Sequence, residues 1–361
     1  MFSTIDAVEL TPSPSSSFDS YRSPLSSRHG HATVALPSAV VVLGGLQGEK
    51  YLNDVYILRD GDAEWSQVEL AGLMMWSPRS GFGCCAVEGV IYVSGGCNAD
   101  GCFNDLWKSE DEGANWTRIQ ENIDHFAAVG PKESYPARAN FYMTYKPTSN
   151  SLVLLGGTDF SEAFNDVYEF DLNRRAPRRW SKVREGRKRI GGVMGFGGKY
   201  DCFGGRYKFW ACQMEEVLYV GGGEDLDDSV YDDVWRSEDW GRTWEKIGKV
   251  REGKNQKGGI IGASACALGG VVFLFGGSLW GRCCASFAQT DFHNCYWSSK
   301  DAGMSWSKVM STEREFLRSS MTATAVKRRN EIVMVGGWDG DDAVGESKSD
   351  DRKIVDTYII V

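Results

Sequence analysis

The sequence has no hydrophobic run long enough to cross a membrane, because its longest apolar runs, such as Val271–Phe275, have the length of a strand. Residues Met1–Leu10 contain neither the basic region nor the apolar core of a secretory signal. We therefore expect a cytoplasmic protein with reduced thiols and no membrane contact. Its net charge of −9, from 40 basic and 49 acidic residues, argues against general binding to nucleic acid.

Histidine is scarce, with four residues in the chain. Asp291 and His293 lie close together in one expected loop, but two ligands are too few for a metal site. The glycine-rich stretch 191–205 lacks the Lys-Ser/Thr of a phosphate-binding loop, and the chain has no nucleophile-elbow or metalloprotease motif. The sequence therefore predicts no metal and no cofactor.

Glycine and tryptophan are abundant, with 43 and 13 residues, which is a reason to look for repeats. A pair of glycines ends a short β-branched or aromatic run six times. Each run is too short for a helix, so it indicates a buried strand followed by a turn with positive φ. The pairs are Gly44-Gly45, Gly95-Gly96, Gly156-Gly157, Gly222-Gly223, Gly276-Gly277 and Gly336-Gly337.

Three further features recur around each glycine pair. In five of the six units, an arginine stands 16 or 18 residues before the first glycine. The exception is the fifth unit, which has Ile260 at that position. A polar pair followed by an aliphatic and an aromatic residue comes after the glycines. The best copies are Asn53-Asp54-Val55-Tyr56, Asn104-Asp105-Leu106-Trp107, Asn165-Asp166-Val167-Tyr168 and Asp232-Asp233-Val234-Trp235, with looser copies at Asn294–Trp297 and Val355–Tyr358. A tryptophan then follows in five units, as Trp65, Trp116, Trp180, Trp244 and Trp306.

These features predict four antiparallel strands per unit, which we name A to D from the first to the last. Arginine begins strand A, glycines end strand B, the aromatic residue lies on C and tryptophan on D. Six such units cannot bury their faces alone, so we expect an all-β fold, a six-bladed propeller formed by residues 1–361 as one domain. The sixth unit ends three residues after Tyr358, without room for a D strand. We expect residues 2–10 to supply that strand and close the ring, with the Ser/Pro-rich segment 11–27 crossing to the first blade.

The Arg28, Gly30 and His31 opening, the glycine pairs, the tyrosine and the tryptophan resemble the kelch-repeat β-propeller family over nearly the whole chain. The resemblance implies scaffolding, substrate-adaptor or cytoskeletal roles. Galactose oxidase shares this fold, but the motif of its copper site has no match here. Three segments also resemble the Asp-box of sialidases: Ser109–Trp116, Ser237–Trp244 and Ser299–Trp306. The arginine motif of sialidases is absent, because Arg189-Ile190 is followed by glycine. We therefore expect the three segments to be structural turns.

The arginines are the strongest functional signal. Strand A is innermost in a propeller, so its first residue is expected at the mouth of the central channel, on the face made by the B–C loops and the D–A connections. A positive ring there would suit carboxylates or phosphates of an acidic or phosphorylated protein partner. The alternative is that each arginine pairs with acids of neighbouring loops, such as Glu224, Asp225, Asp339 or Asp341. The residues of the predicted ring are Arg28, Arg79, Arg138, Arg206 and Arg318.

We therefore predict a kelch-type interaction module, with a scaffold or adaptor role, that binds a protein on this face. The alternative is an enzyme with a loop-built small-molecule pocket in the same place, for instance with sugar mutarotase-like or lyase-like activity. Its acid–base candidates are Glu224, Asp225, Asp291 and His293, whose spacing selects no reaction.

The ten cysteines fall into two classes. Cys85, Cys212 and Cys266 share one position on strand A, so we expect them to be small core residues on separate blades. Cys97 and Cys102 share one expected loop, and Cys283, Cys284 and Cys295 share another. The sequence leaves open whether these loop cysteines form disulfides or remain as redox-active thiols.

Overall fold

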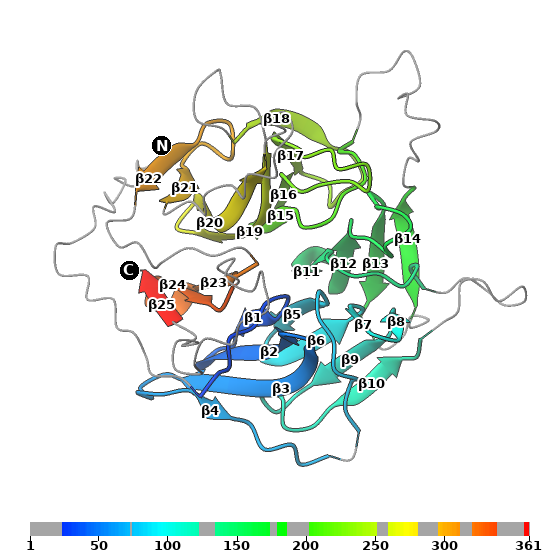
Figure 1. Ribbon diagram of the computed structural model, residues 1–361, viewed down its shortest axis with the longest axis vertical. Helices are drawn as coiled ribbons and strands as arrows, with labels where there is room; N and C mark the ends of the chain where they lie inside the picture. The colour runs from blue at the N-terminus through cyan, green and yellow to red at the C-terminus, as the bar shows by residue number, and fades with distance from the viewer. Residues whose placement is uncertain are drawn as a thin grey trace, which may run out of the picture.

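The strands of the protein are arranged radially as small sheets around a centre, as the computed structural model in Figure 1 shows. The structure describes residues 24–72, 74–122, 134–173, 179–185, 202–250, 259–280, 295–310, 320–337 and 357–360. Regular structure in these residues consists of β-strands and two short 3-10 turns, Pro147–Ser149 and Lys327–Arg329. Within the same ranges, no helix could span a membrane.

Five of the sheets are four-stranded, antiparallel blades whose strands follow one another from the centre outward. The first contains β1 (Ala32–Ala35), β2 (Ala39–Gln47), β3 (Lys50–Arg59) and β4 (Ser66–Gln67), and the second contains β5 (Gly83–Val87), β6 (Val90–Ser94), β9 (Leu106–Ser109) and β10 (Thr117–Gln120). The third contains β11 (Tyr142–Lys146), β12 (Ser151–Leu155), β13 (Val167–Asp171) and β14 (Trp180–Arg184), and the fourth contains β15 (Trp210–Met214), β16 (Val217–Gly221), β17 (Asp233–Ser237) and β18 (Glu245–Lys249). The fifth contains β19 (Gly259–Leu268), β20 (Val271–Trp280), β21 (Cys295–Ser299) and β22 (Ser307–Met310).

The prediction of an all-β propeller with four-stranded antiparallel sheets is confirmed, but with five such blades instead of six. In the described part of the chain, the last unit is a three-stranded sheet of β23 (Thr322–Val326), β24 (Glu331–Val335) and β25 (Thr357–Ile360). The strand expected from residues 2–10 lies outside the described residues, as does most of the crossing segment 11–27. Closure of the ring by that strand therefore stays a prediction.

Polar contacts join the last sheet to both of its neighbours. On one side, the backbone N–H of Ala323 donates to Ser264 Oγ of β19 at 2.8 Å. On the other side, the buried His31 places Nε2 2.8 Å from Thr322 Oγ1 and 3.1 Å from the carbonyl oxygen of Val335. His31, part of the kelch-like opening, thus links the first blade to the last sheet.

A tryptophan at or directly before the start of the D strand of each complete blade packs into the interface with the preceding sheet. Trp116 lies in a cluster with Val55 of the first blade, and Trp244 lies in a cluster with Val167 of the third. Trp65, Trp180 and Trp306 occupy the equivalent clusters of the other blades. Among the described residues, the interface between the fifth blade and the last sheet contains phenylalanine and methionine but no tryptophan. The repeated tryptophan therefore fills the interface between neighbouring blades.

The glycine pairs are required by close packing at the end of strand B. Gly45 and Gly96 have φ of +104° and +88°. A Cβ on either would lie 2.9 or 2.8 Å from the carbonyl oxygen of His29 or Ser80 on the adjacent strand A. The turn with positive φ predicted from the sequence is thus confirmed, and it brings the start of strand A against the glycine carbonyls.

Candidate functional site

The arginines predicted to begin strand A lie four residues before it in the first four blades, and they are buried. Arg79, Arg138 and Arg206 have 0% of their surface exposed and Arg28 has 2%. Arg138 shows the common geometry: Nη1 and Nη2 donate to the two carboxylate oxygens of Asp166 at 2.6 and 3.2 Å. Nη1 also donates to the carbonyl of Gly156 at 3.0 Å, and Nε donates to the carbonyl of Pro136 at 3.0 Å. Each side of the guanidinium fork therefore has a fixed acceptor.

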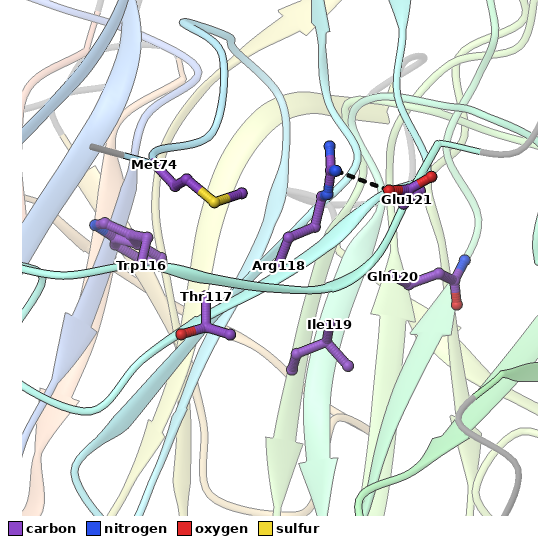
Figure 2. A pocket seen from close by; sticks show the side chains of 7 residues that line it. All are labelled: Met74, Trp116, Thr117, Arg118, Ile119, Gln120 and Glu121. Carbon is purple, nitrogen blue, oxygen red and sulfur yellow. Dashed lines mark hydrogen bonds and ion pairs between the residues drawn. The ribbon is translucent and has the colours of Figure 1, made fainter. Parts of the chain in front are cut away.

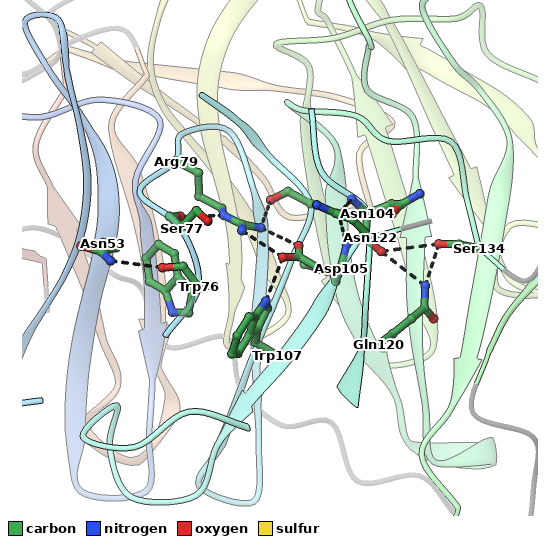
Figure 3. Close-up of polar contacts among 12 residues, drawn as sticks. Asn53, Trp76, Ser77, Arg79, Asn104, Asp105, Trp107, Gln120, Asn122 and Ser134 are labelled. Carbon is green, nitrogen blue, oxygen red and sulfur yellow. Dashed lines mark hydrogen bonds and ion pairs between the residues drawn. The ribbon is translucent and has the colours of Figure 1, made fainter. Parts of the chain in front are cut away.

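The same arrangement recurs in the first, second and fourth blades. In each of these, Nη1 of the arginine lies 2.6 Å from one oxygen of an aspartate. That aspartate is the second residue of the polar pair that precedes the aliphatic and aromatic residues of strand C. Figure 3 shows the second blade, where Arg79 faces Asp105, and Trp107 Nε1 donates to the same carboxylate at 2.8 Å. An aromatic ring lies against the guanidinium in three blades, at 4.0 Å for Phe103, 3.8 Å for Phe164 and 4.0 Å for Tyr231. The pairs are Arg28–Asp54, Arg79–Asp105, Arg138–Asp166 and Arg206–Asp233.

These contacts remove the basis for an exposed positive ring made by Arg28, Arg79, Arg138 and Arg206. The guanidinium groups are buried in ion pairs inside their own blades and hold strand A against strand C, so they present no charge to a partner. The pairing acids are not the loop acids considered from the sequence. Arg318, the fifth member of the predicted ring, lies outside the described residues.

Comparison between the repeats contains a signal for these ion pairs, namely that the arginine and the aspartate are present together or replaced together. The fifth blade has Ile260 at the arginine position and Cys295 at the aspartate position, so both members of the pair are replaced together. In the fourth blade, burial raises the pKa of Asp233, but the charge and hydrogen bonds of Arg206 outweigh this and hold the pKa below its ordinary value.

Two of the four acid–base candidates for an enzyme are occupied by structural contacts. Glu224 is buried, and its Oε1 accepts a hydrogen bond from Lys208 Nζ at 2.7 Å. Asp225 is also buried, and its carboxylate accepts hydrogen bonds from the backbone N–H of Asp227 and of Ser229 and from the Tyr231 hydroxyl, at 2.9–3.0 Å. These carboxylates fix the B–C loop of the fourth blade, so we do not assign them to proton transfer.

The other two candidates, Asp291 and His293, lie outside the described residues. No group of three or more His, Cys, Asp or Glu side chains that could hold a metal ion is found within the described ranges. Of the four acid–base candidates, Glu224 and Asp225 therefore have structural contacts, and the other two are not described.

The segments resembling the Asp-box form hairpin turns between strands C and D. In the first of them, Ser109 Oγ accepts from the N–H of Gly113 at 2.8 Å, and Asp111 Oδ1 accepts from the N–H of Asn115 at 2.9 Å. Trp116 Nε1 donates to the carbonyl of Gly113 at 2.9 Å. The same three contacts recur in the fourth and fifth blades. The carboxylates of these segments thus accept backbone hydrogen bonds of their own turns, as expected for structural elements.

A shallow pocket of about 420 Å³ lies along the D strand of the second blade (Figure 2). Arg118 and Met74 both line it. Arg118 donates to Glu121 at 2.8 Å, and Met74 is 54% exposed. A neighbouring pocket of about 330 Å³ shares Met74 and Arg118. The remaining lining residues of the first pocket are Trp116, Thr117, Ile119, Gln120 and Glu121, which offer no arrangement of acid and base.

Sequence analysis did not identify the exposed apolar residues of the B–C loops. Phe160 is 57% exposed and Leu226 is 40% exposed, at the tips of these loops in the third and fourth blades. Phe160 has a φ of +68°, which is uncommon for a bulky side chain. Exposure of a single residue depends on loop conformation, so the sequence carries no signal for it.

Comparison with known proteins agrees with the repeat architecture. Residues 9–184 match the family model described as the KLHDC2/KLHL20/DRC7 Kelch-repeats domain. This match and the propeller arrangement of the sheets together support the kelch propeller family for this chain.

Curated proteins of several kinds are similar to parts of the chain. It is 28% identical over 155 residues to the dynein alpha chain of the flagellar outer arm of Chlamydomonas reinhardtii, covering 41% of this chain and 3% of that protein. It is 29% identical over 172 residues to Tip elongation aberrant protein 1 of Schizosaccharomyces pombe, covering 46% of this chain and 13% of that protein. The Rho GTPase-activating protein gacHH of Dictyostelium discoideum is 27% identical over 145 residues, 38% of this chain and 9% of that protein. The chain thus spans a small fraction of each of these relatives.

Proposed function

We propose that this protein is a kelch-type interaction module, with a scaffold or adaptor role, that binds a protein partner on the face made by the B–C loops and D–A connections. Support comes from the kelch-repeat match and from the propeller architecture. The cytoplasmic location expected from the sequence stays a prediction.

The observation that carries the proposal is the presentation of exposed apolar side chains by B–C loops that are already fixed. In the third blade, Asp159 Oδ1 accepts hydrogen bonds from the backbone N–H of Ser161 and Glu162 at 2.8 and 2.7 Å, and the N–H of Phe160 donates to Thr158 Oγ1 at 2.8 Å. A loop held in this way loses little conformational entropy when it binds. Exposed aromatic residues are also the side chains that most often dominate protein interfaces.

The charge of these loops suggests the chemistry of the partner. The exposed charged side chains on the B–C loops of the first four blades are Glu49, Lys50, Asp100, Asp227 and Asp228, of which four are acidic and one is basic. An acidic or phosphorylated partner was predicted from an exposed arginine ring, and the buried ion pairs remove that basis. We therefore propose a partner segment that combines basic with apolar side chains, since complementary charge favours its approach.

Affinity purification from native lysate tests the proposal. The double variant Phe160→Asn/Leu226→Ser is expected to lose partners that wild type captures, because both apolar contacts are removed. Asparagine is chosen because it tolerates a positive φ. Met304→Ser is the matched control, since Met304 is 58% exposed but lies in the C–D turn of the fifth blade. Partners that remain bound to the double variant, or no partner on wild type, would contradict binding at these loops.

We also propose that residues 2–10 form a fourth strand beside β25 and complete a sixth blade, so that residues 1–361 form one domain. The last sheet, which has three strands in the described residues, supports this proposal. Deletion of Met1–Leu10 is then expected to lower the melting temperature in differential scanning calorimetry, because β25 loses its outer neighbour. An unchanged melting temperature would contradict this strand, while leaving the interaction function untouched.

A further inference from the structure

Cys97 and Cys102 face each other across a small hairpin on the B–C loop of the second blade. The hairpin consists of β7 (Cys97–Asn98) and β8 (Gly101–Cys102), and the register pairs Cys97 directly with Cys102. Asn98 and Gly101 form the adjacent pair, and Asn98 Oδ1 accepts a hydrogen bond from the N–H of Asp100 at 2.8 Å. The register of the two cysteines is thus fixed by a tight two-residue turn.

The backbone hydrogen bonds define which kind of cross-strand pair this is. The N–H of Cys97 donates to the carbonyl of Ser80, and its carbonyl accepts from the N–H of Ser80, both at 2.9 Å. Since both polar groups of Cys97 point toward Ser80, none points toward β8. Cys97 and Cys102 therefore form a non-hydrogen-bonded pair, in which Cα atoms are about 4.5 Å apart. That separation lies within the range that a disulfide bridges.

The fold itself does not require sulfur at these positions. The equivalent pairs in the other blades are Leu46 with Tyr51 in the first, Thr158 with Ala163 in the third, and Glu224 with Val230 in the fourth. The same backbone therefore accommodates apolar, small and charged side chains. Two cysteines facing each other occur at this position in the second blade alone among the described blades for which the pairing is given.

We propose that Cys97 and Cys102 are a dithiol site that forms a reversible disulfide, with a low-molecular-weight disulfide such as oxidised glutathione as the oxidant. The thiolate of the partly exposed Cys102 attacks one sulfur of the oxidant, forms a mixed disulfide and releases one thiol. The Cys97 sulfur then attacks the Cys102 sulfur and releases the second thiol. Two S–H bonds are replaced by one S–S bond, and the two electrons and two protons leave on the two glutathione thiols.

The surroundings of the pair make this reaction slow and dependent on pH. Burial raises the pKa of Cys102 to about 12, with the charges of Cys97 and Asp159 as further causes. Burial also raises the pKa of Cys97, an effect that a hydrogen bond with Ser80 only partly offsets. Because the thiolate is the attacking species, the rate is expected to rise about tenfold per pH unit between neutral pH and pH 9.

The site lies on the proposed partner face but depends on the hairpin register alone. It would exist whether or not that face binds a protein. Phe103, next to Cys102, lies 4.0 Å over the guanidinium of Arg79, so the hairpin is attached to one of the buried ion pairs.

The test uses the full folded chain incubated with glutathione buffers of increasing oxidised fraction, followed by blocking of free thiols. Cleavage before Asp100 and Asp105 releases a five-residue peptide that contains Cys102 as its single cysteine. Mass spectrometry is expected to find this peptide linked to the peptide of Cys97, with a loss of about 2 Da for the closed bond and full reversal by reduced glutathione.

Three variants make the result specific. Cys97→Ser and Cys102→Ser are each expected to abolish the link, and Cys97→Ser is expected to leave glutathione attached to Cys102. Cys85→Ser is the control, because Cys85 is a core thiol on strand A of the same blade, and it should leave the link unchanged. The proposal is overturned if Cys102 stays reduced in the most oxidising buffer. A link that persists in Cys97→Ser, or a mixed disulfide that never resolves in wild type, also overturns it.

Discussion

Replacement of Arg138 by alanine is expected to lower the free energy of unfolding by about 3–5 kcal/mol. Asp166 is 4% exposed and receives two hydrogen bonds from Arg138, so the variant would bury a carboxylate without its counter-charge. The carbonyls of Gly156 and Pro136 would lose donors as well. Urea-induced unfolding of wild type and variant measures this loss.

The fifth blade supplies the control for this prediction. Ile260 and Cys295 stand at the positions of the arginine and the aspartate in that unit of the sequence, so an uncharged pair occurs naturally in one repeat. The double variant Arg138→Ile/Asp166→Cys removes both charges together and is expected to lose less stability than Arg138→Ala alone. If the double variant is less stable than Arg138→Ala, the unpaired carboxylate of Asp166 is not the main cost of the single substitution.

Acid should weaken the Arg206–Asp233 pair of the fourth blade. The pKa of Asp233 is lowered in the folded protein, so the unfolded chain binds a proton more readily than the folded one. The stability that this carboxylate contributes is therefore complete above its ordinary pKa near 4 and is lost as the pH falls further.

The sequence predicted strand positions well because each repeat carries local signals. Glycine pairs mark the end of strand B, where a Cβ would collide with the carbonyl of His29 or Ser80, and tryptophan marks strand D. The arginine pairs were harder to predict, because Arg28 and Asp54 are separated by 26 residues and meet only when strands A, B and C pair. The expected charge ring followed from placing these arginines at the channel mouth without knowing which acids the strands bring to them.

Other features of the site depend on details of loop conformation. The loop that exposes Phe160 is held by hydrogen bonds to Asp159 and Thr158. Asn98 and Asp225 accept an equivalent hydrogen bond in the second and fourth blades, but the residue that follows them differs in each loop. The facing of Cys97 and Cys102 depends on a two-residue turn between them, and the spacing alone also fits longer loops. These local arrangements differ from blade to blade, so comparison of the repeats does not reveal them.

Replacement of Trp244 by alanine is the second substitution for which we expect a large loss, about 3–5 kcal/mol of unfolding free energy. The ring is 6% exposed and lies edge-on to Phe203, with centroids 4.9 Å apart and planes at 90°. Its Nε1 donates to the carbonyl of Gly241 at 3.1 Å, and a Cβ on Gly241 would lie 2.9 Å from Val167 of the third blade. The substitution would therefore open a cavity between two blades, and urea-induced unfolding measures the cost.

Comparison with Trp306 distinguishes the contribution of burial between blades from that of the hydrogen bond within the hairpin turn. Trp306 makes the same hydrogen bond to its own turn, to Gly303 at 3.1 Å, but is only partly buried. If burial between blades provides most of the energy, Trp306→Ala should cost clearly less than Trp244→Ala, although both lose the same turn contact. Equal losses would show that the stabilisation comes from the hydrogen bond to the turn. A loss below about 1 kcal/mol for Trp244→Ala would contradict its role in packing between blades. Since every complete blade carries such a tryptophan, the first outcome would mean that the ring is held together mainly at the contacts between blades.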